Sequence, residues 1–191
     1  GGPLLANDVT DLTLTAAELR FCDAIREKDR SLRLFLANTS FPANSDAREW
    51  LTYLTGIKTA LGNLNNDLGF VATLLVKHYL ERRFGVVDFD AAGKPQGASG
   101  VDVEASTPDG LSIVGELKTT KPYQPGFGAA QRTQIIKDLN RLAAYKADHR
   151  FMFVVDPDAY SALCRPALAS RAPGVEIVDL VSGATFVCPA P

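Results

Sequence analysis

The chain has 191 residues, a hydrophobic content of 46 % and a formal net charge of −2. This is enough material for a domain with a substantial core, whereas the lack of a run of about 18 apolar residues excludes a transmembrane helix. The three cysteines show no metal-ligand spacing, and the first residues lack the pattern of a secretory signal. We therefore expect a cytoplasmic protein with reduced thiols.

Helical patterns dominate the first part of the chain. A capping box formed by Thr15 and Glu18 begins the first helix, over residues 15–38. Two further helices are predicted over 45–61 and 65–84, the second ended by Gly85. We expect residues 1–64 to form an N-terminal helical region and residues 65–191 to form the core with a C-terminal extension, in one compact unit.

From residue 86 onward the pattern becomes that of alternating strands and helices. Three strands are predicted first, at 86–90, 101–106 and 111–120. An amphipathic helix (129–147) and a strand covered on both faces (151–156) follow, and then a helix (158–170) and two short strands (175–180, 184–188). The predicted fold is α/β: a helix, a three-stranded meander, a helix and a strand, with a mixed sheet flanked by helices.

The segment Pro108-Asp109-Gly110 fixes the register of the second and third strands. Proline favours the second position of a type I turn, and glycine accepts the left-handed conformation that follows. A three-residue loop of this kind pairs Thr107 with Leu111 and therefore Asp102 with Glu116. A two-residue loop would have turned Glu116 to the opposite side of the sheet.

This register gathers charged side chains on one face of the sheet. Because strand side chains alternate, Lys118 and Glu104 share the face of Asp102 and Glu116. Converging carboxylates are oxygen ligands that suit Mg²⁺, and a neighbouring lysine can hold a phosphate or help to activate a water molecule. The cluster predicts metal-assisted attack of water on a phosphodiester, and the alternative interpretation is a surface hairpin with a salt bridge.

Asp102, followed after thirteen residues by Glu116-Leu117-Lys118, resembles the site of the PD-(D/E)xK nuclease superfamily. The order of the predicted elements is similar to that family's restriction-endonuclease-like core, and "SGVDVEA…GELKTT" most resembles type II restriction endonucleases. The resemblance implies that Asp102 and Glu116 bind one or two Mg²⁺ ions and that Lys118 serves the attacking water. Val101 stands where the family has proline, and the literal Pro108-Asp109 lies in the turn.

Other residues are candidates for supporting roles. The family often supplies a polar residue from the helix after the site or an acid from the helix before it, which suggests Gln131 and Asp67 here; Glu104 is a third supporting candidate. Acidic side chains dominate residues 86–116 and basic ones dominate 117–150, as a cation site beside a polyanion track would require. Candidates for contact with DNA are Lys94, Gln96, Lys121, Tyr123, Arg132 and Lys137, and Arg141 is a further basic residue that could neutralise phosphate.

The sequence therefore predicts a Mg²⁺-dependent, sequence-specific endonuclease acting on double-stranded DNA, either a type II restriction enzyme or its catalytic domain. Cutting both strands generally requires two sites, so we expect a homodimer. Three alternatives remain open at this stage: a nuclease of DNA repair or recombination, a DNA-binding module of the same fold that does not cut, and an unrelated α/β domain.

Overall fold

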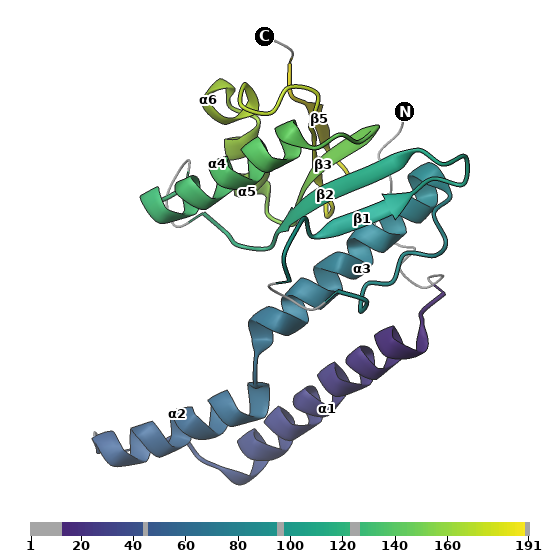
Figure 1. The fold of residues 1–191 in the computed structure, drawn as a ribbon. Helices are drawn as coiled ribbons and strands as arrows, with labels where there is room; N and C mark the ends of the chain where they lie inside the picture. Colours follow the sequence, from purple (N-terminus) through teal and green to yellow (C-terminus); the bar gives the residue numbers. More distant parts are fainter. Residues whose placement is uncertain (1–12, 44–45, 95–97, 123–126, 190–191) are drawn as a thin grey trace. The chain divides into compact units, whose positions relative to one another are not determined.

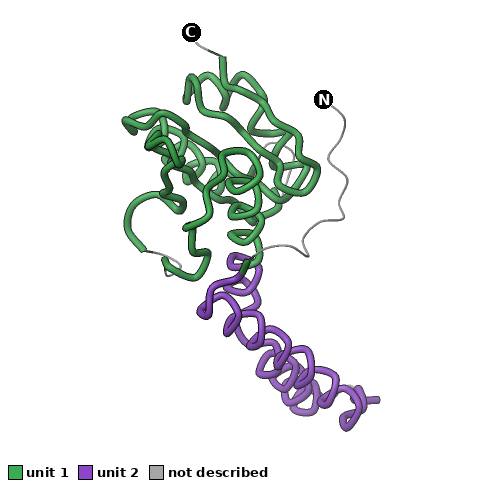
Figure 2. Tube along the Cα trace, turned by 90° about the vertical axis from the view of Figure 1, so that its right-hand side faces the viewer, with its two compact units in different colours: residues 1–13, 71–191 green, residues 14–70 purple. Residues whose placement is uncertain are grey.

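The structure is a computed structural model that describes residues 13–43, 46–94, 98–122 and 127–189. It is an α/β protein in which N-terminal helices precede a five-stranded mixed sheet with interspersed helices. The described residues fall into two compact units (Figure 2): one is formed by residues 14–70, and the other contains Thr13 and residues 71–189. No helix of the described residues is long and apolar enough to cross a membrane.

The first unit is helical. It contains α1 (Ala16–Asn38), α2 (Ala47–Leu61) and the beginning of α3 (Leu64–Phe84). The predicted capping box of α1 is confirmed, since Thr15 and Glu18 exchange both hydrogen bonds. Aromatic rings join α1 and α2, with the centroids of Phe35 and Tyr53 5.5 Å apart. A Cβ atom at Gly56 would lie 2.3 Å from the Phe35 ring, so only glycine permits this close approach.

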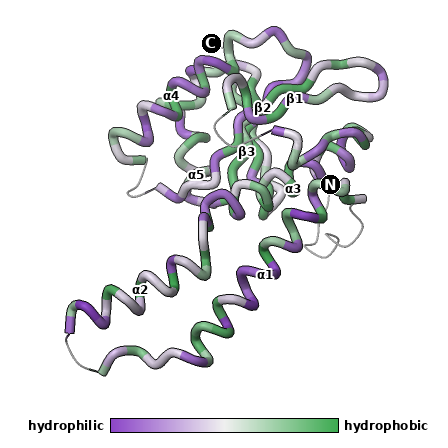
Figure 3. The backbone as a smooth tube through the Cα atoms, turned by 60° about the horizontal axis from the view of Figure 1, so that its bottom comes forward, coloured by the Kyte–Doolittle hydropathy of each residue, from purple (hydrophilic) through white to green (hydrophobic). Residues whose placement is uncertain are grey.

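The second unit is built around the sheet, whose strands follow one another in sequence order (Figure 1). The central pairs β2–β3 and β3–β4 are parallel, and the outer pairs β1–β2 and β4–β5 are antiparallel. The strands are β1 (Val103–Ser106), β2 (Ser112–Lys118), β3 (His149–Val154), β4 (Glu176–Asp179) and β5 (Thr185–Val187). The middle of the sheet is strongly hydrophobic in Figure 3, as strands covered on both faces require.

Helices cover both faces of the sheet. On one face α4 (Ala129–Ala144), α5 (Pro157–Leu163) and α6 (Pro166–Ala169) pack against Val114 and Met152. On the other face, residues of the C-terminal half of α3 pack against Ile113 and Phe151. The helix predicted over 158–170 is divided into α5 and α6 because proline at 166 disfavours a helical conformation in the residue before it.

The strand predicted over residues 86–90 is wrong: these residues do not pair with the sheet. Gly85, with a φ of +69°, ends α3 as predicted, and its N–H and that of Val86 bond back to the helix. At the other end, the Asp90 carboxylate accepts a hydrogen bond from the Ala92 N–H, which begins a turn. The segment therefore runs between the end of α3 at Gly85 and the turn at Asp90. The predicted three-stranded meander is a two-stranded hairpin, formed by β1 and β2.

Candidate functional site

The register of the β1–β2 hairpin is as predicted from its turn. The Thr107 N–H lies 2.8 Å from the Leu111 carbonyl oxygen, and Gly110 has a φ of +89°. Val103 pairs with Gly115, so Asp102, immediately before β1, lies opposite Glu116. The Asp102 Oδ2 atom accepts a hydrogen bond of 2.9 Å from the Leu117 N–H. The side chain of Asp102 is thus fixed to the strand that carries Glu116.

Lys118 is held on the same face by an acid from helix α4. Its Nζ atom lies 2.6 Å from the Asp138 Oδ2 atom, and its side chain is 21 % exposed. Asp138 itself is 1 % exposed and also accepts a hydrogen bond from the Gln134 amide at 3.0 Å. Asp138 was not among the site residues predicted from the sequence. A signal was present, because this acid lies three residues after Ile135 and four before Leu142, within the buried stripe of α4.

Arg141, also from α4, forms an ion pair with the Glu116 carboxylate. Its Nη1 atom lies 2.8 Å from the Glu116 Oε1 atom and 2.8 Å from the Gly100 carbonyl oxygen. Its Nη2 atom lies 3.4 Å from the Asp138 Oδ1 atom. The two buried acids of the site, Glu116 and Asp138, therefore both have basic partners within it. The Arg141 guanidinium links β2, α4 and the residues that precede Asp102.

Burial is the main influence on the charge of Glu116, which is 2 % exposed. It raises the pKa of Glu116 to about 8 from an ordinary value of 4.5. The negative charge of Asp102, a hydrogen bond with the Asp102 carboxyl and the charge of Asp138 add to the rise, while Lys118 opposes it. Two carboxyl groups this close are stabilised by an added cation, whether a proton or a metal ion.

The raised pKa of Glu116 predicts how Glu116→Gln changes the dependence of stability on pH. With a folded-state pKa above the unfolded value, Glu116 binds a proton more tightly in the folded chain, so its contribution to stability falls as pH rises from 4.5 to about 8. Glutamine is neutral throughout. In EDTA, we expect the melting temperature of the variant minus that of the wild type to be at least about 2 °C greater above pH 8 than at pH 5.

Thermal melts of both proteins across this pH range check the prediction. Glu104→Gln is the matched control, since it removes an exposed carboxylate from the same face of the sheet. A Glu116→Gln protein that melts below the wild type by the same amount at every pH would contradict it.

The donor set of the site fits Mg²⁺. Asp102 and Glu116 offer carboxylate oxygens, which hard cations prefer. The described residues contain no group of three or more His, Cys, Asp and Glu side chains arranged to hold a metal ion. Magnesium does not need such a group, because it usually keeps several waters and binds through one or two carboxylates together with substrate phosphates.

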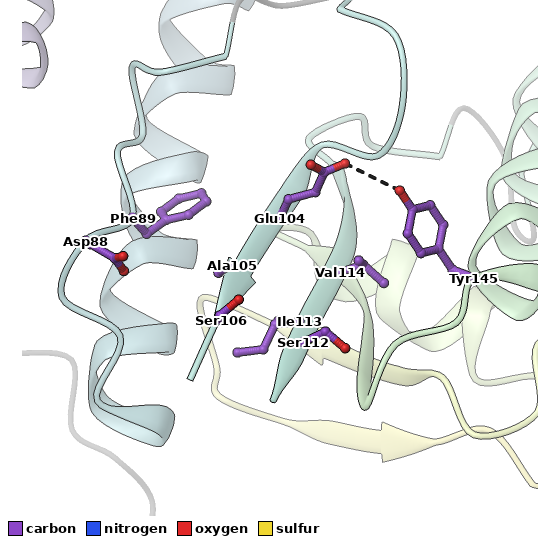
Figure 4. Close-up of a pocket in the computed structure, with 9 residues that line it drawn as sticks. All are labelled: Asp88, Phe89, Glu104, Ala105, Ser106, Ser112, Ile113, Val114 and Tyr145. Atoms are coloured by element: carbon purple, nitrogen blue, oxygen red, sulfur yellow. Dashed lines mark hydrogen bonds between the residues drawn. The ribbon is translucent and has the colours of Figure 1, made fainter. Parts of the chain in front are cut away.

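A groove of about 470 Å³ lies at the free edge of the same hairpin. Figure 4 shows Glu104 on β1 directed toward Tyr145, and their oxygen atoms are 3.5 Å apart. Asp88 and Phe89 line the groove on the other side of β1. Glu104 therefore lies on the predicted face, two residues after Asp102, and it contacts Tyr145 in this groove.

The other supporting candidates have contacts of their own. Gln131 belongs to the first turn of α4, where its amide accepts a hydrogen bond from the Gly128 N–H and donates one to the Lys121 carbonyl. Asp67 belongs to the helical unit, where it forms an ion pair of 2.6 Å with Lys28.

The structure describes four of the six candidates for DNA contact. Lys94 is next to the site and donates a hydrogen bond to the Val101 carbonyl. Lys121 is exposed, 3.6 Å from Asp158. Arg132 and Lys137 belong to α4, where Arg132 is half-buried and Lys137 is exposed. The remaining two candidates, Gln96 and Tyr123, lie outside the described residues.

Comparison with protein-family models, curated proteins and solved structures gives no match for this chain. What defines the site is therefore its own chemistry: two adjacent carboxylates and a lysine on one face of a hairpin, backed by an acid and an arginine from α4.

Proposed function

We propose that this protein is a Mg²⁺-dependent DNA endonuclease with a restriction-endonuclease-like core. The observation that carries the proposal is the hairpin register, which puts Asp102 opposite Glu116, with Lys118 next on the same face. The burial of Glu116 supports it as well, because a buried acid beside a second acid costs stability. Such a cost is often found at functional sites.

In the proposed reaction each residue of the cluster has one task. Asp102 and Glu116 hold Mg²⁺, one or two ions, which supplies Lewis-acid stabilisation of the phosphate and a more acidic water. Lys118 directs its ammonium group at the attacking water or at a phosphate oxygen. Asp138 fixes Lys118 through their 2.6 Å contact, so the ammonium group is already oriented when DNA arrives.

The proposed substrate is double-stranded DNA cut at a specific short sequence, as for a type II restriction enzyme. Two copies of the chain would each cut one strand, with residues 14–70 as an interface or as a part that reads DNA. Two other proposals use the same site: a repair or recombination nuclease would prefer ends or branches, and a non-cleaving module would bind DNA alone.

One observation favours a structural interpretation of the cluster. Lys118 and Arg141 both pair with acids inside the protein, as they would in an ionic network without catalytic function. An unrelated α/β domain with such a network would have no divalent-dependent chemistry on DNA.

Incubation of the purified chain with mixed plasmid and phage DNA, in Mg²⁺ and in EDTA, tests the proposal. Discrete fragments that require Mg²⁺ are the expected result. A smear or nicks would favour the repair class, and salt-sensitive binding without cleavage would favour the binding module. If the chain neither cleaves nor binds DNA, the proposed function is overturned.

A further inference from the structure

Arg141 is a basic residue in direct contact with a proposed metal ligand. Its Nη1 atom contacts the Glu116 Oε1 atom at 2.8 Å, and its side chain is 33 % exposed. The Glu116 carboxylate, in contrast, is almost wholly buried. A guanidinium at this position therefore covers an oxygen that a cation would use.

We infer that Arg141 is an internal counter-ion that a divalent cation must displace from Glu116 in order to bind there; this inference rests on the proposed function. Two cations close to one buried carboxylate repel each other, and the repulsion is strong where water is largely excluded. The contact with Arg141 compensates the charge of Glu116 before a metal ion arrives, and it lowers the affinity of the site for that ion.

The displaced guanidinium would stay close to the site. Its other contacts are the Gly100 carbonyl oxygen at 2.8 Å and the Asp138 carboxylate at 3.4 Å, and neither belongs to a proposed metal ligand. Asp138 is held in turn by Gln134 and Lys118. Arg141 would thus keep two partners when it leaves Glu116, and its freed N–H group could donate to a phosphate oxygen of DNA.

This arrangement predicts that removing Arg141 strengthens metal binding in the absence of DNA. The probe is Mn²⁺, a paramagnetic substitute for Mg²⁺, whose free concentration is read by electron paramagnetic resonance at low salt and about pH 8, where the carboxylate form of Glu116 is well populated. We expect Arg141→Gln to bind Mn²⁺ about tenfold more tightly than the wild type, a coupling of ordinary size. Metal-dependent cleavage should fall, since the guanidinium is no longer available to phosphate.

Two further variants distinguish the displacement of Arg141 by the metal ion from a general effect of removing a positive charge. Arg132→Gln removes one positive charge from the first turn of the same helix and should change Mn²⁺ affinity by no more than about twofold. Arg141→Lys keeps the charge but lacks the planar fork that reaches Glu116 with one nitrogen and Asp138 with the other, so its affinity should lie between those of the wild type and Arg141→Gln. The lysine variant also provides the test if the glutamine variant does not fold.

The outcomes distinguish this inference from the proposed function. Tighter binding by Arg141→Gln, without a comparable gain in Arg132→Gln, supports the inference. Unchanged or weaker binding by both Arg141 variants, or an equal gain in Arg132→Gln, overturns the inference and leaves the proposed function standing. If neither the wild type nor any variant binds Mn²⁺ without DNA, the inference is overturned, whereas the proposed function is judged by Mg²⁺-dependent cleavage, because such sites often bind the ion together with substrate phosphates.

Discussion

Replacement of Lys118 by alanine is expected to reduce the rate of Mg²⁺-dependent DNA cleavage by about a thousandfold, as the loss of a proton-handling or charge-stabilising group commonly does. The ammonium group of Lys118 shares a face with Asp102 and Glu116 and is fixed by Asp138 at 2.6 Å. Single-turnover cleavage with Mg²⁺ measures the effect, and gel-shift binding with Ca²⁺ shows whether DNA is still bound. Binding should be nearly unchanged.

Lys121→Ala is the matched control for this loss. Lys121 lies three residues further along the chain, is 71 % exposed and forms a long ion pair of 3.6 Å with Asp158. Its removal should lower DNA affinity modestly and leave the rate of the bound complex unchanged. A Lys118→Ala enzyme that cuts as fast as the wild type would show that Lys118 has no part in the chemistry.

Replacement of Asp138 by alanine is expected to have the largest effect on stability. Asp138 is a buried carboxylate that contacts Lys118, Arg141 and Gln134. Removing one member of a buried ionic network leaves its partners uncompensated and typically costs about 3–5 kcal/mol. For a chain of this size, that corresponds to a fall of roughly 6–20 °C in melting temperature.

Circular-dichroism melts of the Asp138→Ala protein measure this loss. Asp158→Ala is a suitable control, because Asp158 is exposed and its pairing with Lys121 is long, so its removal should cost at most about 1 kcal/mol. Equal melting of the Asp138→Ala and wild-type proteins would contradict the account of α4 as the support of the site.

The sequence was most informative where local chemistry left few options. The Pro108-Asp109-Gly110 turn determined the loop length, and the loop length determined that Asp102 and Glu116 are opposite each other. The left-handed Gly85 likewise determined where α3 ends. These features depend on backbone preferences within a few residues, which a single sequence displays directly.

Features that depend on distant contacts were predicted less well. The segment 86–90 has the composition of a strand, yet whether it pairs is decided by the turn at Asp90 and by the helix end before it. Gln131 was named as a supporting residue and Asp138 was not, although both are polar residues of α4 and it is Asp138 that contacts Lys118. Residue spacing alone would have favoured Asp138, which falls within the buried stripe of the helix.

Asp102 and Glu116 are the proposed ligands of the metal ion that cuts DNA, and a pair of variants tests this assignment. Asp102→Asn removes a carboxylate from the face of the sheet that carries Glu116. Asp109→Asn removes one from the Pro108-Asp109 pair in the turn. Asparagine can still accept the hydrogen bonds that these aspartates accept from Leu117 and Thr107, so both variants should fold.

The measurement is Mg²⁺-dependent cleavage of the same DNA by the wild type and both variants. We predict cleavage by the wild type and by Asp109→Asn, and a loss of at least about a hundredfold in Asp102→Asn, since the removed carboxylate would weaken the hold on the metal. Cleavage by Asp102→Asn at the wild-type rate, or its loss in Asp109→Asn instead, would contradict the assignment of the site.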